Sequence, residues 1–198
     1  MDDNYCFINK NSISKEICNE IIQLFENSKH KHDGATAGGV NKNVKDTTDL
    51  VIDKNDSEWK EIYTLLENEL RRNTRRYVEK ANNNNKDLKE FKRFQASLSF
   101  ETIQVQKYVK NTGKYIYHED GRIYENRARK ITFLWYLNDI TDGGETEFQD
   151  FKVRPEAGKL ILFPALWTYP HRGNVPISDD KYIMTGWLDE KIHIANKR

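Results

Sequence analysis

Cysteine is scarce in this chain of 198 residues, which contains only Cys6 and Cys18. Two cysteines cannot build the disulfide framework of a small secreted domain, so a reducing, intracellular setting is favoured. Apolar runs of transmembrane length are lacking, and the first residues have neither the basic region nor the apolar stretch of a signal peptide. We therefore expect no membrane partner and a cytoplasmic location, in the host cytoplasm if the source is viral.

A dominant charge of one sign is also missing. The chain has 32 Lys and Arg against 31 Asp and Glu, a formal net charge of +1. Nucleic-acid binding usually depends on a concentrated basic surface, so no nucleic-acid partner is expected. Hydrophobic residues make up 37% and aromatic residues 12% of the sequence, which is enough for one folded domain with a substantial core.

Helical periodicity dominates the N-terminal part. Ser14 is a good N-cap, and the apolar residues that follow predict a helix over about 15–27. A second helix is predicted over about 57–79. The Gly- and Asn-rich segment 34–56 predicts a long irregular loop that could act as a lid beside a site. The asparagine run at 82–85 predicts a further short loop.

From residue 99 onward the pattern changes to the alternation typical of β-strands. Strands are predicted over 5–8, 102–109, 115–117, 131–137, 160–163 and 182–188. Turn signals rich in Gly, Asn and Pro separate the later strands. Two helices followed by many short strands predict an α+β fold in which the helices back a β-sandwich or barrel.

His118, Asp120 and His171 are the most informative residues. Alternate side chains of a strand share a face, so His118 and Asp120 can point at one ion while Glu119 points away. Two imidazoles and one carboxylate leave coordination positions open, which suits non-haem Fe(II) oxygenases. His171 has to come from a distant strand, so only the folded sheet could bind the metal. The alternative is that these are ordinary surface or core polar residues, because isolated motif matches are often false.

Five sequence blocks then occur in a fixed order. They are YVKNTGKYIYHED at 108–120, KITFLWYLN at 130–138, GGETEF at 143–148, PHRG at 170–173 and KYIMTGW at 181–187. Together they resemble the catalytic half of the Fe(II)- and 2-oxoglutarate-dependent dioxygenases, in the prolyl 4-hydroxylase-like branch. The resemblance implies a double-stranded β-helix (jelly-roll) core of mostly antiparallel strands, backed by N-terminal helices. It implies one domain over 1–198, in which 1–95 provides helical support and a flexible loop and 99–189 forms the catalytic jelly-roll.

The resemblance also assigns roles to individual residues. It makes His118, Asp120 and His171 the iron ligands, and Lys181 the cation that pairs with the far carboxylate of 2-oxoglutarate. A lysine buried without a partner would be costly, so an inward Lys181 implies an anionic ligand. The competing explanation for Lys181 is solvation, as for most of the 32 Lys and Arg.

Further cosubstrate contacts are implied at Tyr108 and Thr146, and more weakly at Tyr136. Ordinary aromatic packing with an exposed hydroxyl is the alternative for both tyrosines. On the substrate side, Arg129 resembles a substrate-contacting arginine, although a solvated strand-end cation fits as well. Trp187 resembles an aromatic wall of the substrate pocket, and a buried core tryptophan is the alternative.

The implied reaction consumes O2 and 2-oxoglutarate and yields succinate, CO2 and a hydroxylated aliphatic carbon, with ascorbate as a candidate reductant. Peptidyl proline, in a protein or peptide, is the leading substrate; other protein side chains or free amino acids are alternatives. Collagen-type prolyl hydroxylases commonly have a histidine two positions after the tryptophan, where this chain has Asp189. This departure weakens the transfer of the proline assignment.

Two other classes of function compete with this interpretation. A non-catalytic jelly-roll binding module would have no need for Lys181 together with the two histidines and the aspartate. A nucleic-acid demethylating dioxygenase, which acts on a flipped base, is disfavoured by the near-zero net charge.

Overall fold

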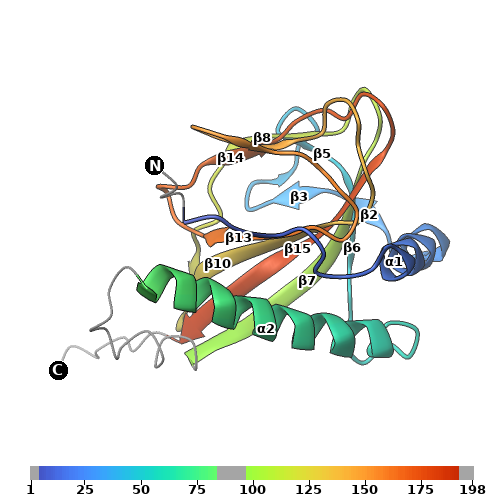
Figure 1. Ribbon diagram of the computed structural model, residues 1–198. Coiled ribbons are helices and arrows are strands. Elements are labelled where there is room, and N and C mark those ends of the chain that lie inside the picture. The colour runs from blue at the N-terminus through green and yellow to red at the C-terminus, as the bar shows by residue number, and fades with distance from the viewer. Residues whose placement is uncertain (1–4, 84–96, 192–198) are drawn as a thin grey trace.

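The computed structural model describes residues 5–83 and 97–191, whose strands form two main sheets that face each other (Figure 1). The larger sheet has eight strands, and its paired strands are antiparallel. In pairing order they are β1 (Phe7–Asn9), β13 (Leu160–Pro164), β10 (Arg127–Tyr136), β15 (Lys181–Lys191), β7 (Leu98–Tyr108), β6 (Thr48–Val51) and β2 (His32–Asp33), with β9 (Ile123–Tyr124) beside β10.

The smaller sheet has five strands and is also antiparallel. Its order is β12 (Lys152–Val153), β11 (Thr146–Phe148), β14 (His171–Gly173), β8 (Lys114–His118) and β5 (Lys45–Asp46). A separate hairpin pairs β3 (Ala35–Thr36) with β4 (Gly39–Val40). Two facing antiparallel sheets confirm the predicted jelly-roll of mostly antiparallel strands.

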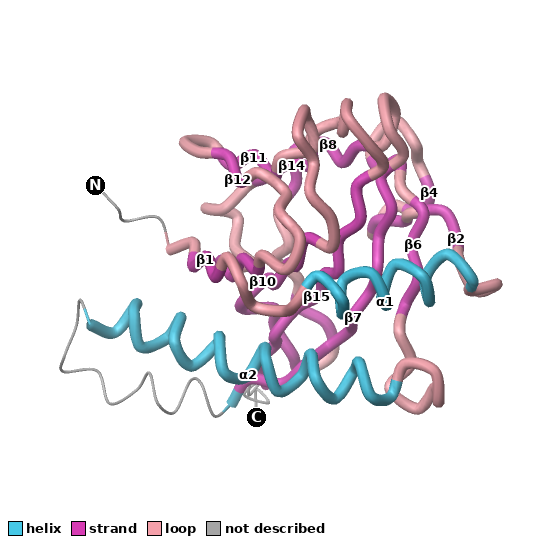
Figure 2. Tube along the Cα trace, turned by 45° about the vertical axis from the view of Figure 1, so that its right-hand side comes forward, coloured by secondary structure: helices cyan, strands magenta, loops and turns pink. Residues whose placement is uncertain are grey.

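Both helices lie on one side of the molecule, outside the larger sheet, as the two views in Figures 1 and 2 show. Helix α1 (Lys15–Asn27) has the predicted bounds, and the Ser14 hydroxyl accepts a hydrogen bond from the backbone N–H of Ile17. Helix α2 spans Lys60–Asn83. The predicted loop at 82–85 is wrong for its first two residues, which continue α2, and residues 84 and 85 lie outside the described part. No helix in the described part of the chain is both long and apolar enough to cross a membrane.

Alternation along β10 builds two cores. Phe133 and Trp135 face the helices and belong to one buried cluster with residues such as Ile21 of α1. Leu134 faces the space between the sheets and joins a second cluster with Phe148 of the smaller sheet. Adjacent side chains of one strand therefore serve opposite faces of the larger sheet. The helices cover one face, and the smaller sheet covers the other.

The predicted irregular loop over 34–56 is wrong, because this segment contains four short strands, β3 to β6. Strand β6 pairs with β7 of the larger sheet, whereas β5 pairs with β8 of the smaller sheet. Backbone hydrogen bonds to strands far along the chain hold the segment, and its own residue pattern does not reveal these partners. Buried Lys45 and Asp49 join the two strands through an ion pair of 2.5 Å.

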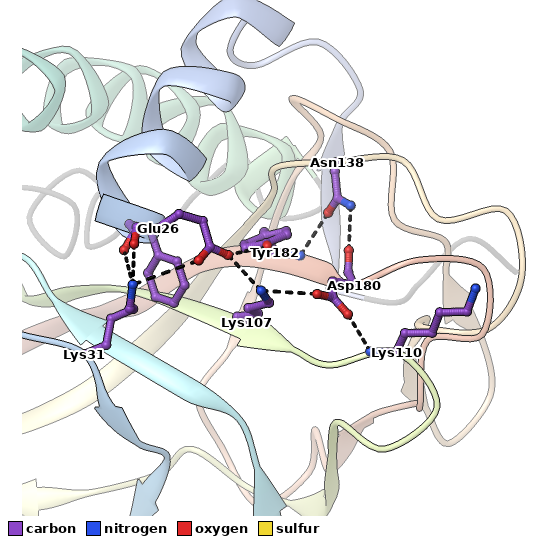
Figure 3. Close-up of polar contacts among 8 residues, drawn as sticks. Glu26, Lys31, Lys107, Lys110, Asn138, Asp180 and Tyr182 are labelled. Carbon is purple, nitrogen blue, oxygen red and sulfur yellow. Dashed lines mark hydrogen bonds and ion pairs between the residues drawn. The ribbon is translucent and has the colours of Figure 1, made fainter. Parts of the chain in front are cut away.

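Polar contacts fix the end of α1 against the larger sheet (Figure 3). The Glu26 carboxylate accepts hydrogen bonds from Lys107 Nζ of β7, at 2.8 Å, and from the Tyr182 hydroxyl of β15, at 2.5 Å. Lys107 Nζ also lies 3.2 Å from the Asp180 carboxylate. Because side chains alternate along strands, the neighbours of Lys107 and Tyr182 point to the opposite face, between the sheets.

Candidate metal centre and adjoining cavity

Two histidines lie directly opposite each other on neighbouring strands of the smaller sheet. His118 is the last residue of β8 and His171 is the first residue of β14, and the strand register pairs them. Side chains of such a cross-strand pair share one face, and the two rings are 4.3 Å apart between centroids. The pairing of β14 with β8 therefore brings together two imidazoles that are far apart in the sequence.

Asp120 completes the group from outside the strand. The prediction that it belongs to the same strand as His118 is wrong, because β8 ends at His118 and Asp120 lies in the irregular segment that follows. The side chain still reaches the same face: Oδ1 lies 3.8 Å from His118 Nε2, and Oδ2 lies 3.6 Å from His171 Nε2. One ligand-type atom from each residue lies within 4.8 Å of the others, and within residues 5–83 and 97–191 no other such group of three occurs.

The contacts of the two imidazoles suit a divalent cation. The Nδ1 atoms of His118 and His171 lie 2.8 and 3.1 Å from the carbonyl oxygens of Ile116 and Tyr169. A proton on each Nδ1 would satisfy these contacts and leave the Nε2 lone pairs facing Asp120. Burial, followed by the neighbouring His171, lowers the pKa of His118 to about 4, so its imidazole is neutral near pH 7.

The Asp120 carboxyl is held ionised in spite of its surroundings. Burial favours the neutral acid, but His171 and His118 outweigh it together with a hydrogen bond from the Thr132 hydroxyl at 2.7 Å, so the pKa of Asp120 is lowered. Two imidazoles and one carboxylate are the donor set that an Fe(II) site with open positions requires. The residues therefore fit the metal that the sequence implied.

A cavity of about 660 Å³ opens beside these three side chains, between the two sheets. Residues 35–38 of the β3–β4 hairpin line part of it. The segment predicted as a lid thus contributes to the wall of the cavity with a two-stranded hairpin. Lys45, from the same segment, lines the cavity as well.

Lys181 lies in the wall of this cavity and is only 1% exposed. It is the first residue of β15, and its Nζ donates to the carbonyl oxygen of Gly144 at 3.0 Å and lies 3.9 Å from the centre of the Tyr108 ring. Burial lowers the pKa of Lys181 to about 7, with a small opposing effect of Glu145. A carbonyl and an aromatic face are weak partners for a buried ammonium group, so an anion in the cavity would stabilise its charged form.

Two further predicted cosubstrate contacts, Tyr108 and Thr146, also line the cavity. Strand register pairs Tyr108 with Lys181, which places both side chains on the inner face of the larger sheet. Tyr136 does not line the cavity: it is fully buried, and its hydroxyl donates to Thr146 Oγ1 at 2.6 Å. Tyr136 therefore packs in the core and hydrogen-bonds Thr146; its hydroxyl is buried, whereas the aromatic-packing alternative expected an exposed one.

The predicted substrate residues, Arg129 and Trp187, are stacked on each other in the cavity wall. The guanidinium carbon of Arg129 lies 3.5 Å from the centre of the Trp187 ring. Asp189 does not line the cavity; its carboxylate accepts hydrogen bonds from Arg127, Tyr124 and, at 2.9 Å, Ser99. The acid in the position of the family histidine therefore belongs to an ion-pair network at one end of the larger sheet.

Sequence patterns did not single out several residues that line the cavity. Tyr115 stacks on the His118 ring with 3.5 Å between centroids, and Lys45 Nζ lies 5.5 Å from the Tyr115 ring. Thr132, the donor to Asp120, stands on the same face of β10 as Leu134, so strand alternation could have indicated its direction. No comparable signal existed for Lys45, because its strand is only two residues long.

Comparison with known proteins agrees with this geometry. Residues 103–189 match the family model of the 2OG-Fe(II) oxygenase superfamily. A search of curated proteins found no significant match.

Three solved structures illustrate the structural likeness. The viral collagen prolyl hydroxylase from Paramecium bursaria Chlorella virus-1, in its 2OG complex, has 19% identity and a TM-score of 0.65, with 96% of this chain and 98% of that chain covered. A Pseudomonas putida prolyl-4-hydroxylase has 17% identity and a TM-score of 0.67, with 94% and 93% covered. A Trichoplax adhaerens prolyl hydroxylase, in complex with a hypoxia inducible factor oxygen degradation domain peptide fragment, has 16% identity and a TM-score of 0.69, with 96% and 85% covered. At these identities the likeness shows a shared fold.

Proposed function

We propose that this chain, a member of the 2OG-Fe(II) oxygenase superfamily by its residues 103–189, hydroxylates an aliphatic carbon of a protein or peptide. The observation that carries the proposal is the presence of two kinds of site in one cavity. The side chains of His118, Asp120 and His171 form a three-point face, and buried Lys181 lines the same cavity. One site suits a metal, and the other suits the far carboxylate of a dicarboxylic acid.

Under this proposal His118 Nε2, His171 Nε2 and one Asp120 oxygen hold Fe(II). When bound, the iron supplies the oxygen chemistry, in which O2 and 2-oxoglutarate yield succinate, CO2 and one hydroxyl group on the substrate. The protein's part is to orient the three side chains, through the contacts of the two imidazole Nδ1 atoms with backbone carbonyls and the hydrogen bond from Thr132 to Asp120. A binding module without catalysis gains nothing from this arrangement.

Lys181, with Tyr108 and Thr146, would receive the cosubstrate. The Lys181 ammonium group would pair with its far carboxylate, and the two hydroxyls would donate hydrogen bonds to it. Arg129 and Trp187 form a stacked pair in the cavity wall and would contact the substrate. Tyr136 acts in this proposal through Thr146, as a positioning residue.

Peptidyl proline is the substrate that we propose first. Support comes from the shared fold with three prolyl hydroxylases, one of which was solved with a peptide. The Asp189 departure bears less on this assignment than the sequence suggested, because Asp189 lies outside the cavity in an ion-pair network. Another protein side chain or a free amino acid is the alternative. Ascorbate as reductant and a cytoplasmic location stay predictions from the sequence.

Mass spectrometry tests the reaction class and the substrate together. The protein is incubated with Fe(II), 2-oxoglutarate, O2 and a panel of proline-containing peptides, with matched peptides in which alanine replaces proline. We expect a gain of one oxygen on proline and an equal amount of succinate. Succinate without oxidised proline would exclude proline but keep the oxygenase. A lack of succinate under all conditions would favour the binding module.

The affinity for 2-oxoglutarate should depend on pH through Lys181, whose pKa burial lowers to about 7. A bound anion favours the ammonium form, so above pH 7 binding takes up a proton. We expect the affinity of anaerobic Co(II)-loaded protein to fall between pH 7 and 9, by up to about tenfold per unit. Calorimetry in buffers of different ionisation enthalpy would measure the uptake. A Lys181→Met variant should bind weakly without this pH dependence, and a wild-type affinity that is constant over the range would contradict the assignment.

A further inference from the structure

A cluster of polar side chains covers the outer face of the smaller sheet, behind the proposed metal centre. At its middle is Glu147 of β11, a side chain only 12% exposed. One of its oxygens, Oε1, accepts hydrogen bonds from Arg172 at 2.6 Å and from the Tyr117 hydroxyl at 3.0 Å. The other, Oε2, lies 2.8 Å from Lys152 Nζ and accepts from Asn174 at 2.9 Å.

The partners of Oε1 are the chain neighbours of the two histidines. Tyr117 precedes His118 on β8, and Arg172 follows His171 on β14. Alternation sends each neighbour to the outer face while its histidine faces inward. The strand order β11, β14, β8 and the register of Phe148 with His171 and of His171 with His118 place the three strands side by side. One carboxylate oxygen thus bridges the outer face behind both imidazoles.

The pairing of β14 with β8 is irregular, so a side-chain link between these two strands would stabilise it. The register shifts between His171 and Gly173, so the backbone ladder is irregular beside the metal face. The Arg172 guanidinium also lies over the Tyr117 ring, at 4.9 Å from its centre, and ties the same two strands. Without a side-chain link, the histidine pair would depend on this irregular ladder alone for its spacing.

We propose that Glu147 is a positioning residue that sets the distance between His118 and His171 by binding Tyr117 and Arg172 on the opposite face of the sheet. The inference rests on the proposed function, since it presumes that the two histidines hold a metal. Groups that orient metal ligands from outside commonly change metal affinity by about 10- to 100-fold. An ion pair with a merely structural role would instead change the free energy of unfolding and leave Co(II) affinity as it is.

Two residues, Glu26 and Lys152, serve as controls for Glu147. Glu26 accepts hydrogen bonds from Lys107 and Tyr182 across two strands of the larger sheet, in the same manner, but far from the histidine strands. Lys152 is a partner of Glu147 that belongs to β12, which carries neither histidine. Removal of Glu26 or Lys152 should therefore leave the histidine pair undisturbed.

The test is titration of the full-length, metal-free protein with Co(II), followed by its visible absorption bands, with the free energy of unfolding measured in parallel. For Glu147→Ala we expect about tenfold weaker Co(II) binding and altered bands. Tyr117→Phe and Arg172→Met should each weaken binding in the same direction. Lys152→Ala and Glu26→Ala should bind Co(II) like the wild type, although both lose an ion pair.

A conservative variant separates orientation from charge. Glu147→Gln keeps an acceptor oxygen for Tyr117 and Arg172, and should recover affinity to within about threefold of the wild type. If Glu147→Gln lost as much Co(II) affinity as Glu147→Ala, the charge of Glu147, and not its hydrogen bonds to Tyr117 and Arg172, would account for the effect. Equal Co(II) affinity and bands in wild type and Glu147→Ala would also overturn the inference while leaving the metal centre intact. A wild-type protein that does not bind Co(II) would instead overturn the proposed function.

Discussion

Replacing His171 with alanine is expected to abolish 2-oxoglutarate turnover while the protein stays folded. The change removes one of three ligand atoms that lie within 4.8 Å of one another. Even the loss of a group that only orients a ligand commonly costs about 10- to 100-fold in metal affinity, so loss of the ligand itself should cost more. Succinate formation measured at saturating Fe(II), together with Co(II) titration, would record both effects.

The control for this variant is His32→Ala. His32 is an exposed residue of β2 whose ring contacts the backbone of its own neighbour, Asp33. We expect wild-type turnover and wild-type Co(II) binding from it. Circular dichroism should show the same strand content in both variants. Turnover by a folded His171→Ala protein at the wild-type rate would remove the metal assignment.

Replacing Lys181 with alanine should raise the 2-oxoglutarate requirement steeply without affecting metal binding. A hydrogen bond to a charged group contributes about 1.5–3 kcal/mol, and each 1.4 kcal/mol corresponds to a factor of ten. We therefore expect the KM for 2-oxoglutarate to rise about 10- to 100-fold. Co(II) affinity in the absence of cosubstrate should stay close to the wild-type value, because Lys181 contacts none of the three ligand residues.

Lys159 provides a matched control, since it is also buried, at 5% exposure. Its Nζ is already paired with Glu156 at 2.7 Å and with the carbonyl of Arg154 at 2.8 Å, and it does not line the cavity. Lys159→Met should lower stability but leave the KM for 2-oxoglutarate unchanged. Lys181→Met, of similar volume to lysine, separates loss of charge from the cavity that alanine would leave. An unchanged KM in both Lys181 variants would refute its role.

Regular elements were predictable where a long local pattern exists. Helix α1 has the predicted bounds because its N-cap and its apolar spacing are both local signals. The long strands β10 and β15 were found, although β15 begins at Lys181 and extends to Lys191, beyond the predicted end. Strands β5, β11 and β14 were missed, because two or three residues are too few to show alternation. Pairing with distant strands stabilises these short segments.

In the candidate site, too, some features were predictable from the sequence and others required the tertiary structure. Motif order alone predicted His118, Asp120, His171 and Lys181, and the structure gathers these side chains around one cavity; Asp120, however, lies beyond the end of β8 and not within a strand. Tyr136 was predicted, more weakly, to contact the cosubstrate; its hydroxyl donates a hydrogen bond to Thr146, and it is not among the residues that line the cavity. From the sequence, a tyrosine whose hydroxyl faces a cavity cannot be distinguished from one whose hydroxyl hydrogen-bonds a cavity-lining residue.

The sequence by itself determined the helix at the N-terminus and the β-rich second half, because each depends on local periodicity, and it predicted the candidate metal and cosubstrate residues from their motifs. Only the tertiary structure decided that His171 stands opposite His118, that segment 34–56 joins both sheets, and that Glu147 bridges the strands behind the two histidines. These facts depend on strand register. The alternation within a strand constrains its register, because a one-residue slip would turn every side chain to the other face, but it does not identify the distant strand with which the segment pairs.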